Sequence, residues 1–170
     1  MMPRLIAILL TISTVAVTVA ADLPVLKAEA KVANRRCEVE VTRSEKFGER
    51  RDYWGTDGTI PSSVVSDVRI SVDGTEWPCP REAFQDLAEV QYDSQVGFDQ
   101  DGANGSVVII IRGGDGAGAY AARLTLVDKR IATREITSGG GFVIEVSKWR
   151  EGIVVSRVYT NSYGSEKSDP

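Results

Sequence analysis

Short stretches that alternate apolar and polar residues, each ended by turn residues, recur about every ten residues along this chain. In residues 37–43, Val39 and Val41 alternate with Glu38 and Glu40, a pattern typical of a strand with one buried face. Similar stretches predict strands at 67–77, 106–112, 119–127, 130–136, 142–149 and 152–160. Because short strands linked by tight turns bury their apolar faces against another sheet, the pattern predicts a mainly β fold.

Two architectures agree with this pattern, an antiparallel barrel and a two-sheet sandwich. The strands follow one another through short turns, such as Asp73-Gly74 and Asp128-Lys129, and this order favours the barrel. The sequence does not decide between them.

Residues 80–89 depart from the alternation. Pro80 fits the first position of a helix, Glu82 would lie in its first turn, and Phe84, Leu87 and Ala88 would share one face. We therefore predict one short helix over residues 81–89, closing an end or edge of the sheet.

The glycine-rich segment after Val107–Ile111 has the form of a dinucleotide-binding motif, because Gly114, Gly116 and Ala119 fit the spacing G-x-G-x-x-A. That motif requires a helix after the turn, whereas the residues that follow alternate as a strand. We therefore predict a hairpin loop at Gly113–Gly118, with glycines at positive φ, between antiparallel strands at Val107–Ile111 and Tyr120–Leu126.

The N-terminal residues have the order of zones found in a secretory signal peptide. Arg4 precedes the apolar, uncharged run Leu5–Ala20, and small residues follow it. We expect a signal peptide at 1–21, a single β domain at 22–160, a frayed polar tail at 161–170, and export to a bacterial periplasm or the medium.

The charge balance argues against two classes of partner. The chain has 20 basic and 24 acidic residues, a net charge of −4, and no evident basic stripe. It therefore lacks an electrostatic surface for phosphate backbones or anionic lipids, and we expect no nucleic-acid partner and no membrane contact of the mature form.

The two cysteines, Cys37 and Cys79, are expected to form one disulfide in an oxidising compartment. Cys79 lies between two prolines, a stiff setting that favours a structural bond over a mobile nucleophile.

The chain has no histidine, which excludes Ser-His-Asp triads, Cys-His pairs and histidine-ligated metals. No serine lies three positions before a lysine, so the Ser-x-x-Lys motif is absent too. We expect no enzymatic activity, no metal and no cofactor. A hydrolase built on two carboxylates stays open as an alternative.

The turn-rich segment Gly48–Ser63 is the candidate binding loop. It places Arg50, Arg51, Tyr53 and Trp54 close together, and such residues commonly anchor interfaces. In the alternative interpretation, Trp54 closes the end of the core and the two arginines cover it.

Two segments, PREAFQDL (Pro80–Leu87) and GGDGAGAY (Gly113–Tyr120), together resemble a pattern in uncharacterised small exported bacterial β-rich proteins. The resemblance implies an exported β-rich domain and carries over no functional residue.

These observations favour a non-enzymatic exported module with a binding or structural role, which contacts a protein or envelope component through the candidate binding loop. The alternatives are a carrier of a small apolar ligand inside a barrel, and the carboxylate-based hydrolase.

Overall fold

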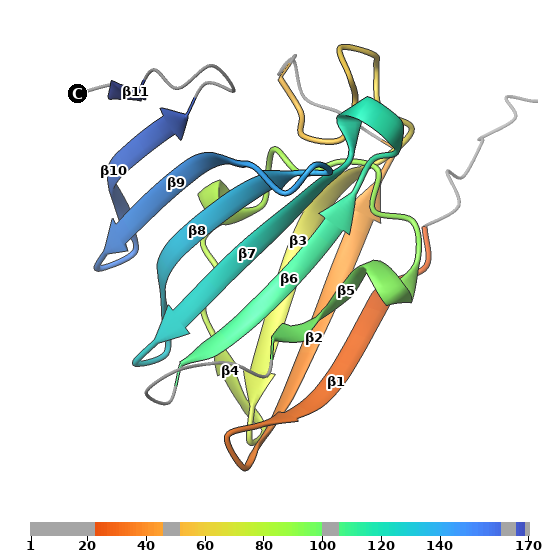
Figure 1. The fold of residues 1–170 in the computed structure, drawn as a ribbon. Helices are drawn as coiled ribbons and strands as arrows, with labels where there is room; N and C mark the ends of the chain where they lie inside the picture. Colours follow the sequence, from red (N-terminus) through yellow and green to blue (C-terminus); the bar gives the residue numbers. More distant parts are fainter. Residues whose placement is uncertain (1–22, 46–51, 100–105, 161–165, 169–170) are drawn as a thin grey trace, which may run out of the picture.

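Two antiparallel sheets make up the fold in the computed structural model, which describes residues 23–45, 52–99, 106–160 and 166–168 (Figure 1). The first sheet has the order β1 (Leu26–Val32), β2 (Arg35–Ser44), β3 (Val64–Val72), β4 (Thr75–Trp77). The second has the order β11 (Glu166–Ser168), β10 (Ile153–Thr160), β9 (Val143–Arg150), β8 (Arg130–Ser138), β7 (Tyr120–Val127), β6 (Val107–Gly113), β5 (Val96–Asp99).

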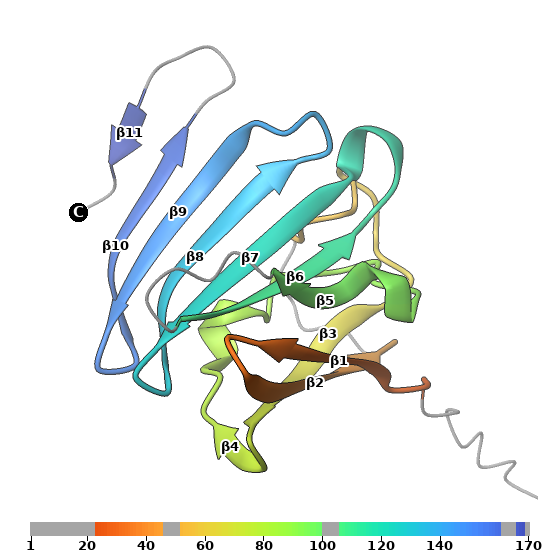
Figure 2. The same ribbon diagram turned by 60° about the horizontal axis from the view of Figure 1, so that its bottom comes forward.

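The sheets form an open sandwich, so the predicted mainly β class is confirmed, while the favoured closed barrel is not formed. The edge strands β1 and β5 lie close to each other, yet their strand ladders belong to separate sheets (Figure 2). The longer sheet continues past the shorter one, and every residue of β10 keeps some exposure to solvent (Figures 1 and 2).

The core lies between the sheets and is filled by inward-facing side chains of both. Because successive residues of a strand point to opposite faces, β2 contributes Val39 and Val41 and β7 contributes Leu124 and Leu126, all at most 1 % exposed. Burying one such side chain contributes roughly 1.5–3 kcal/mol.

Tight turns with two residues at positive φ connect four pairs of neighbouring strands, β1–β2, β3–β4, β7–β8 and β9–β10, because their twist matches that of the strands. The predicted turns are confirmed at Asp73-Gly74 (φ 51° and 76°) and at Asp128-Lys129 (φ 49° and 66°). Ala33-Asn34 joins β1 to β2 in the same way, with φ values of 47° and 65°.

The glycine-rich segment is the connection of a hairpin, as predicted. Strand β6 pairs antiparallel with β7, from Val107 opposite Leu126 to Gly113 opposite Tyr120. Gly114 and Gly116 have φ values of 69° and 47°, and only a three-residue 3₁₀ turn, Gly116–Gly118, interrupts the loop.

The predicted helix over 81–89 is wrong. Only Arg81–Ala83 form a helical turn, of the 3₁₀ type. Leu87 N–H still donates to the Phe84 carbonyl over 2.9 Å, but from Asp86 onward the backbone carbonyls accept from distant segments, as when Val65 N–H donates to the Leu87 carbonyl over 2.8 Å. Tertiary pairing outweighs the helical pattern here.

Three strands lie outside the predicted set: β1, β5 and β11. β11 falls within the predicted frayed tail, where Glu166–Ser168 pair with the otherwise open edge of β10. Among the described residues there is no helix with the length and apolar character needed to span a bilayer.

The predicted disulfide is not formed, and Cys37 and Cys79 are free. Cys37 lies opposite Val72 of β3, whereas the β3–β4 register, continued past Trp77, brings Cys79 level with Val68. Four residues along a strand span about 13 Å, and a disulfide requires Cα atoms within about 7 Å. Burial raises the pKa of the Cys79 thiol to about 12, so little of it is thiolate.

Candidate functional site

The segment Phe84–Glu89, here called the strap, joins the candidate binding loop to both sheets. Trp54 N–H donates to the Asp86 carbonyl over 2.8 Å, and Ala88 N–H donates to the Trp54 carbonyl over 3.0 Å. The Glu89 carbonyl accepts from Gly114 N–H over 3.1 Å. The strap therefore fixes the backbone of Trp54 relative to the glycine-rich hairpin.

Glycines let these segments approach each other closely. A Cβ on Gly113 would lie 2.4 Å from the Ala88 carbonyl oxygen, and one on Gly114 would lie 2.7 Å from the Cα of Gly55. Gly55 itself has a φ of 101°, which a side chain disfavours. The glycine-rich segment, which has the form of a dinucleotide-binding motif, thus packs closely against the candidate binding loop and supports it.

A polar cluster occupies the inner face of the second sheet where it extends past the first. The register aligns Arg134 of β8 with Ser147 of β9 and Arg157 of β10, and it aligns Glu145 with Tyr159 one row away. Arg134, Glu145 and Ser147 are each at most 1 % exposed. A buried charge requires a partner, and these five residues supply partners to one another.

The cluster is connected by hydrogen bonds and ion pairs. Ser147 Oγ donates to Glu145 Oε1 over 2.7 Å and accepts from Arg157 Nε over 3.2 Å. Arg134 Nη2 lies 3.6 Å from Glu145 Oε2. Burial lowers the pKa of the Arg157 guanidinium, but its hydrogen bond with Tyr159 and the charge of Glu145 raise it further, and the net direction is upward.

Asp86 brings a second buried carboxylate from the strap. Its Oδ2 accepts from Arg134 Nη2 over 2.8 Å, and the residue is 4 % exposed. Its other oxygen, Oδ1, is buried and has no donor among the residues that the structure describes. Arg134 Nε is likewise buried and has no acceptor among these residues. A buried acceptor without a donor costs roughly 1–3 kcal/mol.

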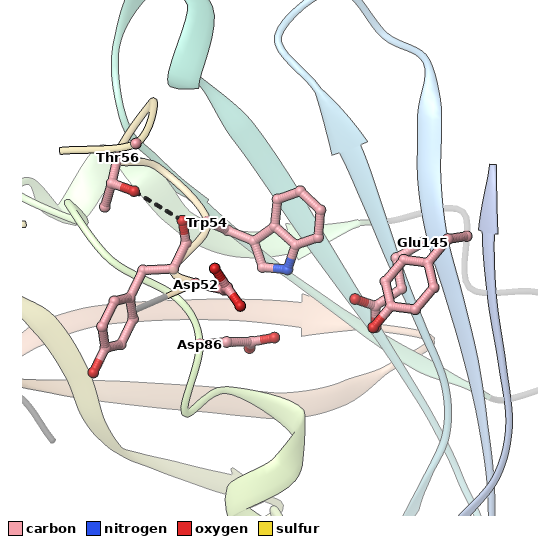
Figure 3. Close-up of a pocket in the computed structure, with 8 residues that line it drawn as sticks. Asp52, Trp54, Thr56, Asp86 and Glu145 are labelled. Atoms are coloured by element: carbon pink, nitrogen blue, oxygen red, sulfur yellow. Dashed lines mark hydrogen bonds between the residues drawn. The ribbon is translucent and has the colours of Figure 1, made fainter. Parts of the chain in front are cut away.

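These elements enclose an open hollow of about 450 Å³, here called the acidic cleft. Figure 3 shows the side chains of Asp52, Asp86 and Glu145 extending toward the space beside the Trp54 indole. The lining consists of three carboxylates, three aromatic rings and two small residues: Asp52, Asp86, Glu145, Tyr53, Trp54, Tyr159, Thr56 and Gly58.

Tyr53 and Trp54, predicted as binding residues, both line the acidic cleft and are both half-buried. Trp54 also packs against the core, as the alternative interpretation of this residue expects, while its role in binding stays a prediction. Thr56 Oγ1 donates to the Tyr53 carbonyl over 3.1 Å and stiffens the loop (Figure 3). Arg50 and Arg51 lie outside the described residues.

Asp86, Arg134 and Glu145 were not predicted as site residues from the sequence. A signal was present for Glu145, which occupies the same face of its strand as Trp149 and so points inward. No comparable signal marked Asp86, because the predicted helix placed it on an outer face.

No group of three or more acidic or cysteine side chains in the described parts of the chain is arranged to hold a metal ion. No family model, no curated protein and no solved structure matches the chain. The geometry of the acidic cleft is therefore the basis for a functional proposal.

Proposed function

We propose that this chain is an exported binding module, without enzymatic activity, that contacts a protein or another envelope component through the acidic cleft. The observation that carries the proposal is the pair Tyr53 and Trp54, two half-buried rings on the wall of a hollow whose other wall is polar. Aromatic rings held on a rigid loop bind at a low entropic cost. The signal-peptide pattern of residues 1–21 supports export.

The two alternatives have less support. A carrier of an apolar ligand needs an enclosed apolar cavity, whereas the space between the sheets is occupied by side chains such as Ile109, Leu124 and Ile136, all 0 % exposed. A carboxylate-based hydrolase needs one acid to donate a proton. Here an oxygen of Asp86 and one of Glu145 already accept from Arg134 and Ser147, respectively.

The proposal is tested by capture of partners from an envelope extract on immobilised mature protein. We compare the wild type with Tyr53→Ala and Trp54→Ala, and we use Tyr92→Ala as the matched control. Tyr92 is 63 % exposed and does not line the acidic cleft. Far-UV circular dichroism and the thermal midpoint verify folding of each variant.

We expect at least one partner that the wild type and Tyr92→Ala retain and that both cleft variants lose. Identical sets of captured proteins and polysaccharides for all four proteins would contradict the proposed binding surface.

A further inference from the structure

The charge of the acidic cleft is one-sided. Its described lining contains the carboxylates of Asp52, Asp86 and Glu145 and no lysine or arginine. Among the described residues, Arg134 pairs with Asp86 over 2.8 Å and Arg157 lies 3.7 Å from Glu145, and Arg134 is 0 % exposed. These two arginines balance Asp86 and Glu145, so within the described part of the chain the exposed carboxylate of Asp52 leaves one negative charge in excess.

Asp86 presents the specific acceptor. Its Oδ2 is occupied by Arg134, whereas its Oδ1 has no donor among the described residues. Asp86 is only 4 % exposed and lines the cleft. A ligand N–H that reaches Oδ1 would therefore complete the hydrogen bonding of this carboxylate. The negative charge of the lining and the unpaired buried oxygen of Asp86 are independent observations, and both favour a ligand that is a positively charged hydrogen-bond donor.

The aromatic rings narrow the class of cation. The indole of Trp54 borders the space onto which Asp86 and Glu145 face (Figure 3). Aromatic faces attract ammonium and guanidinium groups. The three carboxylates are not grouped closely enough to coordinate a metal ion, so the geometry favours an organic cation over a divalent metal.

We propose that the acidic cleft binds a primary ammonium or guanidinium group of its partner, which donates to Asp86 Oδ1 and lies against the ring of Trp54. This inference rests on the binding function proposed above and names the chemical group that is recognised. The group has two sources in an envelope, a basic side chain of a protein and the amine of an amino sugar.

The test titrates ¹⁵N-labelled mature protein with pairs of probes that differ in charge, followed by amide and indole chemical shifts. N-acetyl-lysine amide and N-acetyl-arginine amide represent protein side chains, with N-acetyl-norleucine amide as the neutral control. Glucosamine represents an amino sugar, with glucose as its control, at about pH 6 where the amine is protonated. Asp86→Asn removes one charge at constant size, and Asp52→Asn does the same at an exposed position.

We expect the Trp54 indole and the strap amides to shift with at least one cationic probe and with neither neutral probe. Asp86→Asn is expected to weaken that binding about tenfold or more, and Asp52→Asn to weaken it less. Since Asp52 is exposed, its variant keeps the test valid if Asp86→Asn does not fold.

Equal shifts with every cationic probe and its neutral control, or no shift with any cationic probe, would overturn the recognition of a cation while leaving the binding module intact, provided that the envelope partner is still captured. Loss of capture by the wild type itself would refute the binding module. The two failures are thus distinguishable.

Discussion

The Tyr120 hydroxyl on β7 donates a hydrogen bond of 3.0 Å to the backbone carbonyl of Ala88, 32 residues earlier in the chain. Burial raises the pKa of this hydroxyl, so it is a neutral donor at every physiological pH. The bond attaches the strap to the second sheet at the position where the strap also bonds to Trp54. A buried phenol thus acts together with the backbone bonds of the strap to place the acidic cleft.

Tyr120→Phe is expected to destabilise the protein by about 1–3 kcal/mol, because the variant leaves the Ala88 carbonyl without its side-chain donor. Urea unfolding at constant pH measures this loss. Tyr92→Phe, at a site 63 % exposed, serves as the control and is expected to unfold like the wild type. Equal midpoints for all three proteins would show that this bond does not stabilise the fold.

A methyl group on Gly113 has no space, whereas one on Gly97 is accommodated. Both glycines lie in strands, and neither has a left-handed φ, but a Cβ on Gly113 would lie 2.4 Å from the Ala88 carbonyl oxygen and one on Gly97 would meet nothing within 4 Å. We expect Gly113→Ala to be strongly destabilising, and Gly97→Ala to be neutral or stabilising by up to about 1 kcal/mol. Thermal unfolding of the two variants checks this contrast, and similar midpoints would contradict it.

Arg134→Met is expected to cost about 3–5 kcal/mol, because it leaves the buried carboxylate of Asp86 without its cation. The double variant Arg134→Met/Asp86→Leu removes both charges and should be more stable than the single variant. The exposed pair of Arg69 and Asp67, 3.2 Å apart, provides the comparison, and Arg69→Met should change stability by at most about 1 kcal/mol. Chemical denaturation gives all three values; a double variant less stable than Arg134→Met would exclude charge pairing as the cause.

The ionisation of Glu89 makes the stability of the strap depend on pH. Burial raises the pKa of its carboxyl, but hydrogen bonds from the backbone and hydroxyl of Ser62 and from Gln91 lower it further, so the net value lies below the ordinary 4.5. Folding therefore favours the ionised form. The resulting stabilisation is complete above the unfolded pKa and is lost as the pH falls through the lower folded value.

For Glu89→Gln we consequently expect a shallower decline of the unfolding free energy between about pH 6 and pH 3 than for the wild type. Urea unfolding at a series of pH values measures it. Glu76→Gln, at an exposed position of β4, is the matched control and should keep the wild-type slope. Parallel curves for wild type and Glu89→Gln would contradict the role of Ser62 and Gln91.

Both thiols should be detectable without a reducing agent. In the folded protein, Cys79 is expected to react slowly with a thiol reagent at about pH 8, because its pKa is raised to about 12. After denaturation both cysteines should react at once. A denatured protein with no reactive thiol would instead demonstrate the disulfide that the structure lacks.

The features predicted correctly from the sequence are those decided by neighbouring residues. Asp73-Gly74 forms a hairpin because two adjacent residues adopt positive φ, and the strands on either side of Gly113–Gly118 pair because the connection is short. Tyr53 and Trp54 were predicted as binding residues of a turn-rich loop; both line the cleft and are half-buried, and their role in binding stays a prediction.

The features that were missed depend on distant partners. The strap contains a helical pattern, yet its backbone bonds reach Trp54, Val65 and Gly114, and none of these partners is visible from local periodicity. Likewise the separation of Cys37 from Cys79 depends on the register across three strands. Asp86 meets Arg134 only because the strap crosses beneath the second sheet.

The strap also has a kinetic consequence. Within each sheet every ladder joins strands that are consecutive in the chain. Apart from β2 and β3, which residues 45–63 connect, these hairpins close short loops at a small entropic cost. The strap instead brings together residues near 54, 64, 88 and 114, which is a slower, non-local event. We therefore expect the hairpins to form early and the acidic cleft to form only at the last step of folding, so that a partly folded chain has its sheets but not yet the cleft.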